Sequence, residues 1–113
     1  MSSLSNRIQL IGNLGVDPET KSLPSGGMVC NFTLATEEKY TRDGEVVSMV
    51  EWHRLVAYEK VAETVGKLLK KGHRAAFEGR ITYRSYEDNE GATRYVTEVV
   101  VTKFLKLTPK DAV

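Results

Sequence analysis

One segment carries most of the information about the fold: Glu51-Trp52-His53-Arg54-Leu55-Val56-Ala57-Tyr58. Its composition favours a β-strand, and side chains two residues apart on a strand share a face. Trp52, Arg54, Val56 and Tyr58 therefore line one side. Two rings that flank a guanidinium can stack bases and hold phosphate, which indicates a surface for single-stranded nucleic acid. An aromatic residue on a strand is more often part of the core. The neighbouring segments are therefore needed to choose between a core position and a base-stacking position.

The segments on either side predict a small β-protein. Cys30, Phe32 and Leu34 alternate with polar residues, as expected for a half-buried strand. Asp43-Gly44 is a two-residue hairpin signal that joins this strand to the segment above. The predicted strands are residues 7–14, 28–38, 46–58, 75–86 and 95–107.

The sequence period changes after Tyr58, where the apolar residues take the spacing of one helical face. These residues are Val61, Ala62, Val65, Leu68 and Leu69. A helix between the third and fourth strands predicts an all-β OB-fold, a five-stranded Greek-key barrel. An open antiparallel sheet packed on one helix is the alternative. We expect residues 1–107 to form this one domain and residues 108–113 to form a short tail.

The composition limits the classes of protein to consider. The 113 residues suit one domain, and a single cysteine, Cys30, allows no intrachain disulfide. The sequence has no apolar run of about 18 residues and no secretory signal, so we expect a cytoplasmic protein. A net charge of +1 is low for a nucleic-acid binder. Binding therefore requires the two signs of charge to lie on different faces.

Catalysis finds little support in the sequence. His53 next to Glu51 suggests acid–base chemistry, yet both lie on the strand face opposite Trp52. No nucleophile, base and orienting group can be assembled, and the glycines form no phosphate-binding loop. With two histidines and one cysteine the sequence predicts no metal site, and we expect neither a cofactor nor an enzyme.

Further rings lie beside basic residues. Arg80, Thr82, Arg84 and Tyr86 alternate on one face of the fourth predicted strand, and Tyr40 follows Lys39. Each tyrosine alone is typical of a hairpin surface, but the joint pattern favours base stacking. Each stacked base is worth roughly 1–3 kcal/mol, and each phosphate contact contributes about −0.7 to the salt slope, so low net charge does not prevent tight binding.

Tyr40 and the helical lysines each have two interpretations. Strict alternation places Tyr40 with Phe32 and Leu34 unless the strand bulges or ends first. The face opposite Arg84 is expected to point inward through Phe77, Ile81 and Tyr83. The helical lysines also have two interpretations, as DNA contacts or as the solvated face of an amphipathic helix: Lys60, Lys67, Lys70 and Lys71.

Several segments together resemble one known family, the bacterial single-stranded DNA-binding proteins. The similarity runs from Asn6 to about Val101. The segments that carry it are Ile11-Gly12-Asn13-Leu14-Gly15, Asp17-Pro18-Glu19, Thr33-Leu34-Ala35-Thr36, Glu51-Trp52-His53-Arg54, Lys71-Gly72, Glu78-Gly79-Arg80 and Tyr95-Val96-Thr97-Glu98-Val99.

The resemblance implies an OB barrel that works as a homotetramer, a dimer of dimers around which DNA wraps. It implies a subunit-interface role for His53. It places DNA-binding positions, stacking and basic, at Tyr40, Trp52, Arg54, Tyr58, Lys60, Lys71, Arg84 and Tyr86. Arg7 and Arg94 match the basic positions less closely.

Members of this family usually continue into a flexible linker with an acidic tip that recruits replication and repair proteins. This sequence stops at Val113 without either, which indicates a core fragment or a naturally short form. The resemblance implies sequence-independent coating of single-stranded DNA in replication, recombination and repair. The alternatives are a protein-interaction module, as in primosome accessory proteins, and an RNA-binding OB protein. Substitution of Trp52 should weaken binding and preserve assembly, and substitution of His53 should do the opposite.

Overall fold

The computed structural model describes residues 4–108, so of the predicted tail only Thr108 is described. These residues form six strands and one helix. The elements are β1 (Ile8–Leu14), β2 (Glu19–Ser22), β3 (Met28–Arg42), β4 (Glu45–Tyr58), α1 (Glu59–Leu68), β5 (Arg74–Glu87) and β6 (Thr93–Lys106). The five long predicted strands and the helix are all present, with ends that differ by at most four residues.

Five of the strands close into a barrel. The order is β1-β5-β6-β4-β3, and β3 returns to β1 through the pairs Asn13–Ala35 and Leu14–Leu34. β1 crosses β3 so closely that a Cβ on Gly12 would lie 2.0 Å from the Ala35 carbonyl oxygen. Only glycine permits that approach. The predicted OB-fold is confirmed, with α1 between the third and fourth barrel strands.

The short strand β2 was not predicted. Its four residues pair antiparallel with the start of β3, from Ser22–Met28 to Glu19–Asn31. All four side chains are exposed, so the segment has no apolar alternation from which a strand could be inferred. Backbone hydrogen bonding alone makes it a strand, and it lies at the edge of the sheet.

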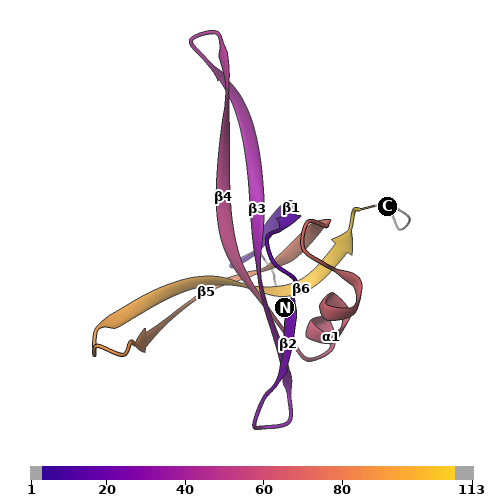
Figure 1. Ribbon diagram of the computed structural model, residues 1–113, viewed down its shortest axis with the longest axis vertical. Coiled ribbons are helices and arrows are strands. Elements are labelled where there is room, and N and C mark those ends of the chain that lie inside the picture. Colours follow the sequence, from indigo (N-terminus) through magenta and orange to yellow (C-terminus); the bar gives the residue numbers. More distant parts are fainter. Residues whose placement is uncertain (1–3, 109–113) are drawn as a thin grey trace.

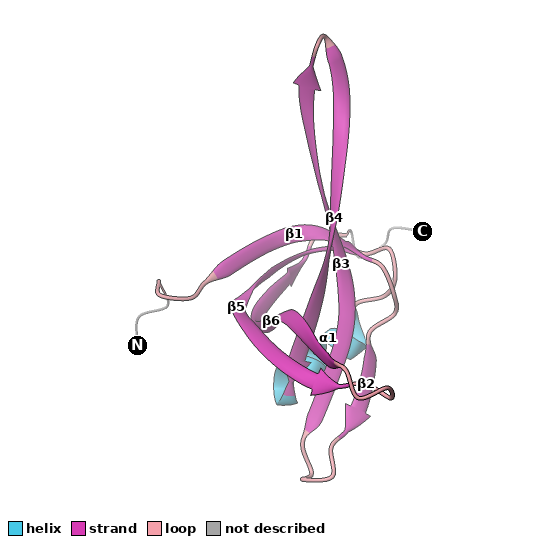
Figure 2. Cartoon of the chain, turned by 90° about the vertical axis from the view of Figure 1, so that its left-hand side faces the viewer, coloured by secondary structure: helices cyan, strands magenta, loops and turns pink. Residues whose placement is uncertain are grey.

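Two hairpins extend well beyond the barrel (Figures 1 and 2). β3 and β4 stay paired without a bulge from Val29–Tyr58 to Arg42–Glu45. The predicted turn follows, with Asp43 at φ 52° and Gly44 at φ 82°, the left-handed backbone of a type I′ turn. The radius of gyration is 16.1 Å, above the ~13 Å expected for a compact domain of this length. The second hairpin, β5–β6, projects in a different direction (Figure 1).

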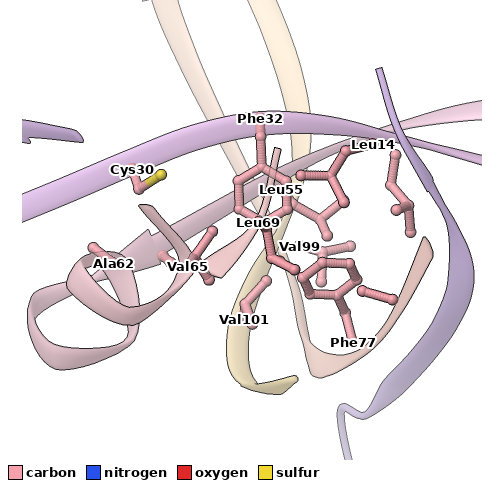
Figure 3. Close-up of a cluster of buried hydrophobic side chains, with 13 residues drawn as sticks. Leu14, Cys30, Phe32, Leu55, Ala62, Val65, Leu69, Phe77, Val99 and Val101 are labelled. Carbon is pink, nitrogen blue, oxygen red and sulfur yellow. The ribbon is translucent and has the colours of Figure 1, made fainter. Parts of the chain in front are cut away.

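The core lies between the barrel strands and α1 (Figure 3). Phe32 and Phe77 meet with ring centroids 5.3 Å apart, and Val65 and Leu69 close the helix side. Cys30 is fully buried, and burial raises the pKa of its thiol, so it acts as a small apolar residue as predicted. Truncation of Phe77 to alanine would cost about 3–5 kcal/mol.

The hairpins also explain a wrong prediction. Phe77 points inward and Ile81 is half-buried, but Tyr83 is 76% exposed. β5 has left the barrel by residue 83, so the face that is buried at Phe77 no longer has a core to cover it. Among residues 4–108, no helix is long and apolar enough to cross a membrane.

Candidate nucleic-acid interface

The two faces of β4 differ as its alternation predicts. Trp52 is 63% exposed and Tyr58 46%, with Arg54 exposed between them, whereas Leu55 and Ala57 are buried in the core. Val56 shares the face of Trp52 but is buried, at the point where β6 pairs with β4. We call the side of β4 that carries Trp52, Arg54 and Tyr58 the ring face.

Trp52 lies against a glycine, Gly15, in the bend that follows β1. A Cβ built on Gly15 would lie 2.4 Å from Cζ3 of the indole and 2.8 Å from Oγ1 of Thr33. Gly15 itself is fixed because its amide donates to the Thr33 carbonyl at 3.0 Å. One part of the indole therefore lies against bare backbone, which sets the position of the ring while most of its surface stays accessible.

The tryptophan lies beside a hollow of about 420 Å³ between β4 and the β5–β6 hairpin. Rings and cations from both hairpins line this hollow, because β4 and β6 pair only at Leu55–Val99 and Val56–Val100 and diverge on the N-terminal side of these pairs. The rings and cations that line this first hollow are Trp52, His53, Arg54, Tyr86, Arg94 and Tyr95. Residues more than 30 positions apart in sequence thus form one surface for bases and phosphate.

A second hollow continues from Arg54 toward the start of β3. Lys21, Arg54 and Arg84 are its cations. The carboxylate of Glu98 lines both hollows, and among residues 4–108 no other Asp or Glu does. The two hollows together therefore carry four basic side chains, Lys21, Arg54, Arg84 and Arg94, against one acid. This is the local sorting of charge that a net charge of +1 requires.

Arg84 is held by its neighbours. Its Nε donates to Oε1 of Glu98 at 2.8 Å and its Nη2 to Oε2 at 3.3 Å. The hydrogen bonds and charge of Glu98 raise the pKa of the guanidinium, with a small contribution from Tyr58 and Tyr86. Its Cζ lies 5.9 Å from the centroid of the Tyr86 ring. The guanidinium of Arg84 thus lies within cation–π distance of the Tyr86 ring. Glu98 already compensates part of its charge.

Tyr40 lies apart from these rings. It pairs with Val47 in the part of the β3–β4 hairpin that extends beyond the barrel, where it is 41% exposed. Because the register has no bulge, the ring shares the face of His53 rather than that of Trp52. Its exposure comes from the length of the hairpin, and its role in binding stays a prediction.

The two predicted lysines line neither hollow. Lys60 lies in the first turn of α1, directly after the corner at Glu59, and Lys71 lies in the turn before β5. The Lys71 backbone amide donates to Oδ1 of Asp17 at 2.8 Å, which fixes that turn. Both side chains are exposed, at the end of the barrel that α1 covers.

His53 lies on the opposite face of β4 from Trp52, as predicted. It is half-buried, and its Nε2 is 2.9 Å from Oγ1 of Thr36 on β3. Among residues 4–108, no group of three His, Cys, Asp or Glu side chains could hold a metal ion.

A comparison with family models supports this geometry. The model described as the single-strand binding protein family matches residues 5–107. This chain belongs to that family. It is also similar to a solved structure described as the Plasmodium falciparum SSB complex with ssDNA, with a TM-score of 0.83 and 32% sequence identity. The match covers 95% of this chain and 97% of the other.

Within this member of the family, sequence reasoning missed four residues of the site. Gly15, Glu98 and Tyr95 were part of the resemblance but were given no role, and Lys21 was not singled out. A signal existed for Tyr95, because it follows Arg94 as Tyr40 follows Lys39. No local signal marks Gly15 or Glu98, since their partners lie far away in sequence.

Proposed function

We propose that this chain binds single-stranded DNA without sequence preference, and that it coats and protects exposed strands during replication, recombination and repair. One observation carries the proposal: Trp52 and Tyr86, from two hairpins, line one hollow together with Arg54 and Arg94. Rings stack any base, and guanidinium groups bind any phosphate. The surface therefore suits a single strand of any sequence, and the chain acts by binding rather than by catalysis.

We assign the stacking of bases to four of the exposed rings, Trp52, Tyr58, Tyr86 and Tyr40, and the contacts with phosphate to basic residues. Trp52 and Tyr58 on the ring face and Tyr86 across the first hollow are supported by their position and exposure. Tyr40 extends the surface along the β3–β4 hairpin. The proposed phosphate contacts are Arg54, Arg84, Lys60 and Lys71.

Competition measurements test this proposal. An oligo-dT labelled with fluorescein is bound, and unlabelled DNA, matched RNA and duplex DNA are added to displace it. We expect single strands of different sequence to compete alike and the duplex to compete at least ten times more weakly. Equal competition by the duplex would contradict single-strand binding, and stronger competition by RNA would favour the RNA-binding alternative.

We also propose that four copies of the chain assemble as a dimer of dimers. β1 pairs with β5 along Ile8–Asn13 but meets β3 only at Asn13 and Leu14, so among residues 4–108 its second edge from Ile8 to Gly12 has no strand partner. Such an edge is a template for a strand of another copy. Light scattering at micromolar concentration tests this, and a monomer there would contradict it.

A further inference from the structure

A second basic surface lies on a different part of the molecule, between α1 and the end of β6. Two hollows follow each other there, of about 420 and 540 Å³. The first is lined by Lys60, Val61, Thr64, Thr102, Lys103 and Phe104. The second is lined by Lys67, Leu68, Lys70, His73, Lys106 and Thr108. We call the two together the lysine groove.

The groove is strongly cationic. Of its five lysines, only Lys67 has a carboxylate partner within residues 4–108, and that pair, with Glu63 at 3.2 Å, is exposed. Exposed pairs of this kind contribute little and exchange readily for another anion. Lys60 and Lys67 lie along α1, and Lys103 and Lys106 face them from β6. The groove is therefore suited to a chain of negative charges that runs along the helix.

The chemistry of the groove differs from that of the ring face. Its two rings are half-buried: Phe104 is stacked on Phe77 with centroids 6.1 Å apart and a 23° interplanar angle, and Nδ1 of His73 accepts from the Lys70 amide at 3.1 Å. An exposed face that could take a base is thus missing from the described lining residues. The groove can hold the sugar–phosphate backbone but has little with which to hold bases.

The groove begins where the ring face ends. Tyr58 is the last residue of β4, and Lys60 follows it after Glu59 alone. The corner is fixed, because Glu59 has a left-handed backbone with φ 54° and its Oε1 accepts from the Met28 amide at 2.7 Å. A strand of DNA that leaves the ring face at Tyr58 therefore meets Lys60 and the groove behind it.

We propose that the lysine groove binds the phosphate backbone of the same DNA strand, as a continuation of the ring face without base stacking. This proposal rests on the proposed single-strand binding and extends its path. Of the two interpretations of the helical lysines, the proposal favours contact with DNA over a solvated helix face. An acidic peptide with apolar side chains is the other class of ligand that the groove could take.

Oligonucleotides of two lengths separate these possibilities. The K67Q/K103Q/K106Q variant is titrated over a series of salt concentrations with oligo-dT of about 8 nucleotides, enough for the ring face, and of about 35 nucleotides. We expect unchanged affinity for the short strand. For the long strand we expect the salt slope to be lower by about 2, because each of the three lost phosphate contacts contributes about 0.7. The affinity should be lower by up to about 100-fold near 0.1 M salt.

The K67R/K103R/K106R variant is the matched control, because it keeps the charges and should bind both strands as the unmodified chain does. An equal loss of affinity for the two lengths would overturn the proposal, because it would show a general effect of charge and no separate contact in the groove. Unchanged binding of both lengths would overturn it as well, and loss of binding to an acidic peptide would then assign the groove to that ligand. Failure of the unmodified chain to bind the short strand would instead refute the proposed function.

Discussion

The two faces of β4 carry alternating residues of one strand, yet they meet opposite surroundings. Trp52, Arg54 and Tyr58 are exposed, and two of them carry large rings whose apolar faces are left in contact with water. Leu55 and Ala57, one position away, are buried in the core. The reverse face thus stabilises the barrel, while the ring face leaves apolar area uncovered until a ligand covers it.

This difference separates binding from folding. A side chain that contributes to the core cannot be changed without loss of stability, but the exposed rings contribute little to the folded chain alone. Substitutions on the ring face should therefore change affinity and leave the melting temperature nearly unchanged. Each prediction below tests that separation, from the largest expected effect to the smallest.

The largest effect is expected for W52A combined with Y58A. Removing two stacking rings should cost about 2–6 kcal/mol of binding free energy, a loss of roughly 30-fold to more than 10,000-fold. Fluorescence anisotropy of labelled oligo-dT measures it, and the thermal unfolding midpoint should stay within about 3 °C, since both side chains are exposed.

H53A is the matched variant on the reverse face. His53 bonds to Thr36 from the face of β4 opposite Trp52, although it also borders the first hollow. We expect its loss to shift assembly, measured by light scattering, and to lower DNA affinity far less than W52A/Y58A does. The contrast between the two faces fails if W52A/Y58A binds DNA normally. Loss of a protein partner with DNA binding intact would favour the protein-interaction module instead.

The second prediction concerns the support of the tryptophan. G15A places a methyl group 2.4 Å from the Trp52 ring and should displace it, with a loss of up to one stacked base, about 1–3 kcal/mol of binding. G12A is the contrasting change, because its Cβ meets backbone and should lower stability rather than affinity. Anisotropy and thermal unfolding distinguish the two, and a G15A variant with full affinity would show that the position of the indole is unimportant.

The third prediction is a gain of affinity. E98Q removes the carboxylate that compensates Arg84 and lines both hollows. The salt slope should steepen by about 0.7 and the affinity should rise about fivefold near 0.1 M salt. E90Q, an exposed carboxylate without an ion-pair partner among residues 4–108, is the control and should have little effect. Weaker binding by E98Q would mean that Glu98 is needed to orient Arg84.

The smallest effect is expected in the β5–β6 turn. The hydrogen bond from Arg94, followed by those from the Ala92 and Glu90 amides, lowers the pKa of Asp88 below its usual value of 3.8. A carboxylate with a lowered pKa stabilises the turn above the ordinary pKa and loses that contribution as the pH falls through the folded value. The protection of the Glu90 and Ala92 amides from hydrogen exchange, relative to the intrinsic rate at each pH, should therefore decrease below about pH 3.8. D88N should abolish this pH dependence, and an identical pH profile in D88N would contradict it.

Much of the fold was predictable from the sequence because its signals are local. Alternation around Phe32, the Asp43-Gly44 turn and the helical spacing from Val61 each depend on a few adjacent residues. Trp52 and His53 were assigned to opposite faces for the same reason, since a strand has a period of two.

The remaining features depend on contacts that no local pattern contains. β2 forms only because β3 offers backbone partners, and the contact of Gly15 with Trp52 joins the bend after β1 to a strand far away in sequence, β4. Tyr83 was placed inward because alternation cannot show where a strand leaves the barrel. The lysine groove needs α1 and β6 side by side, which sequence order alone does not give.

The most direct test uses the only tryptophan of the chain. Because Trp52 is 63% exposed at the edge of the first hollow, its fluorescence should be strongly quenched when oligo-dT stacks on the indole. The quenching should saturate and persist at about 1 M salt, where phosphate contacts contribute least. Saturable binding by anisotropy with unchanged Trp52 fluorescence, or equal quenching by duplex DNA, would contradict the account.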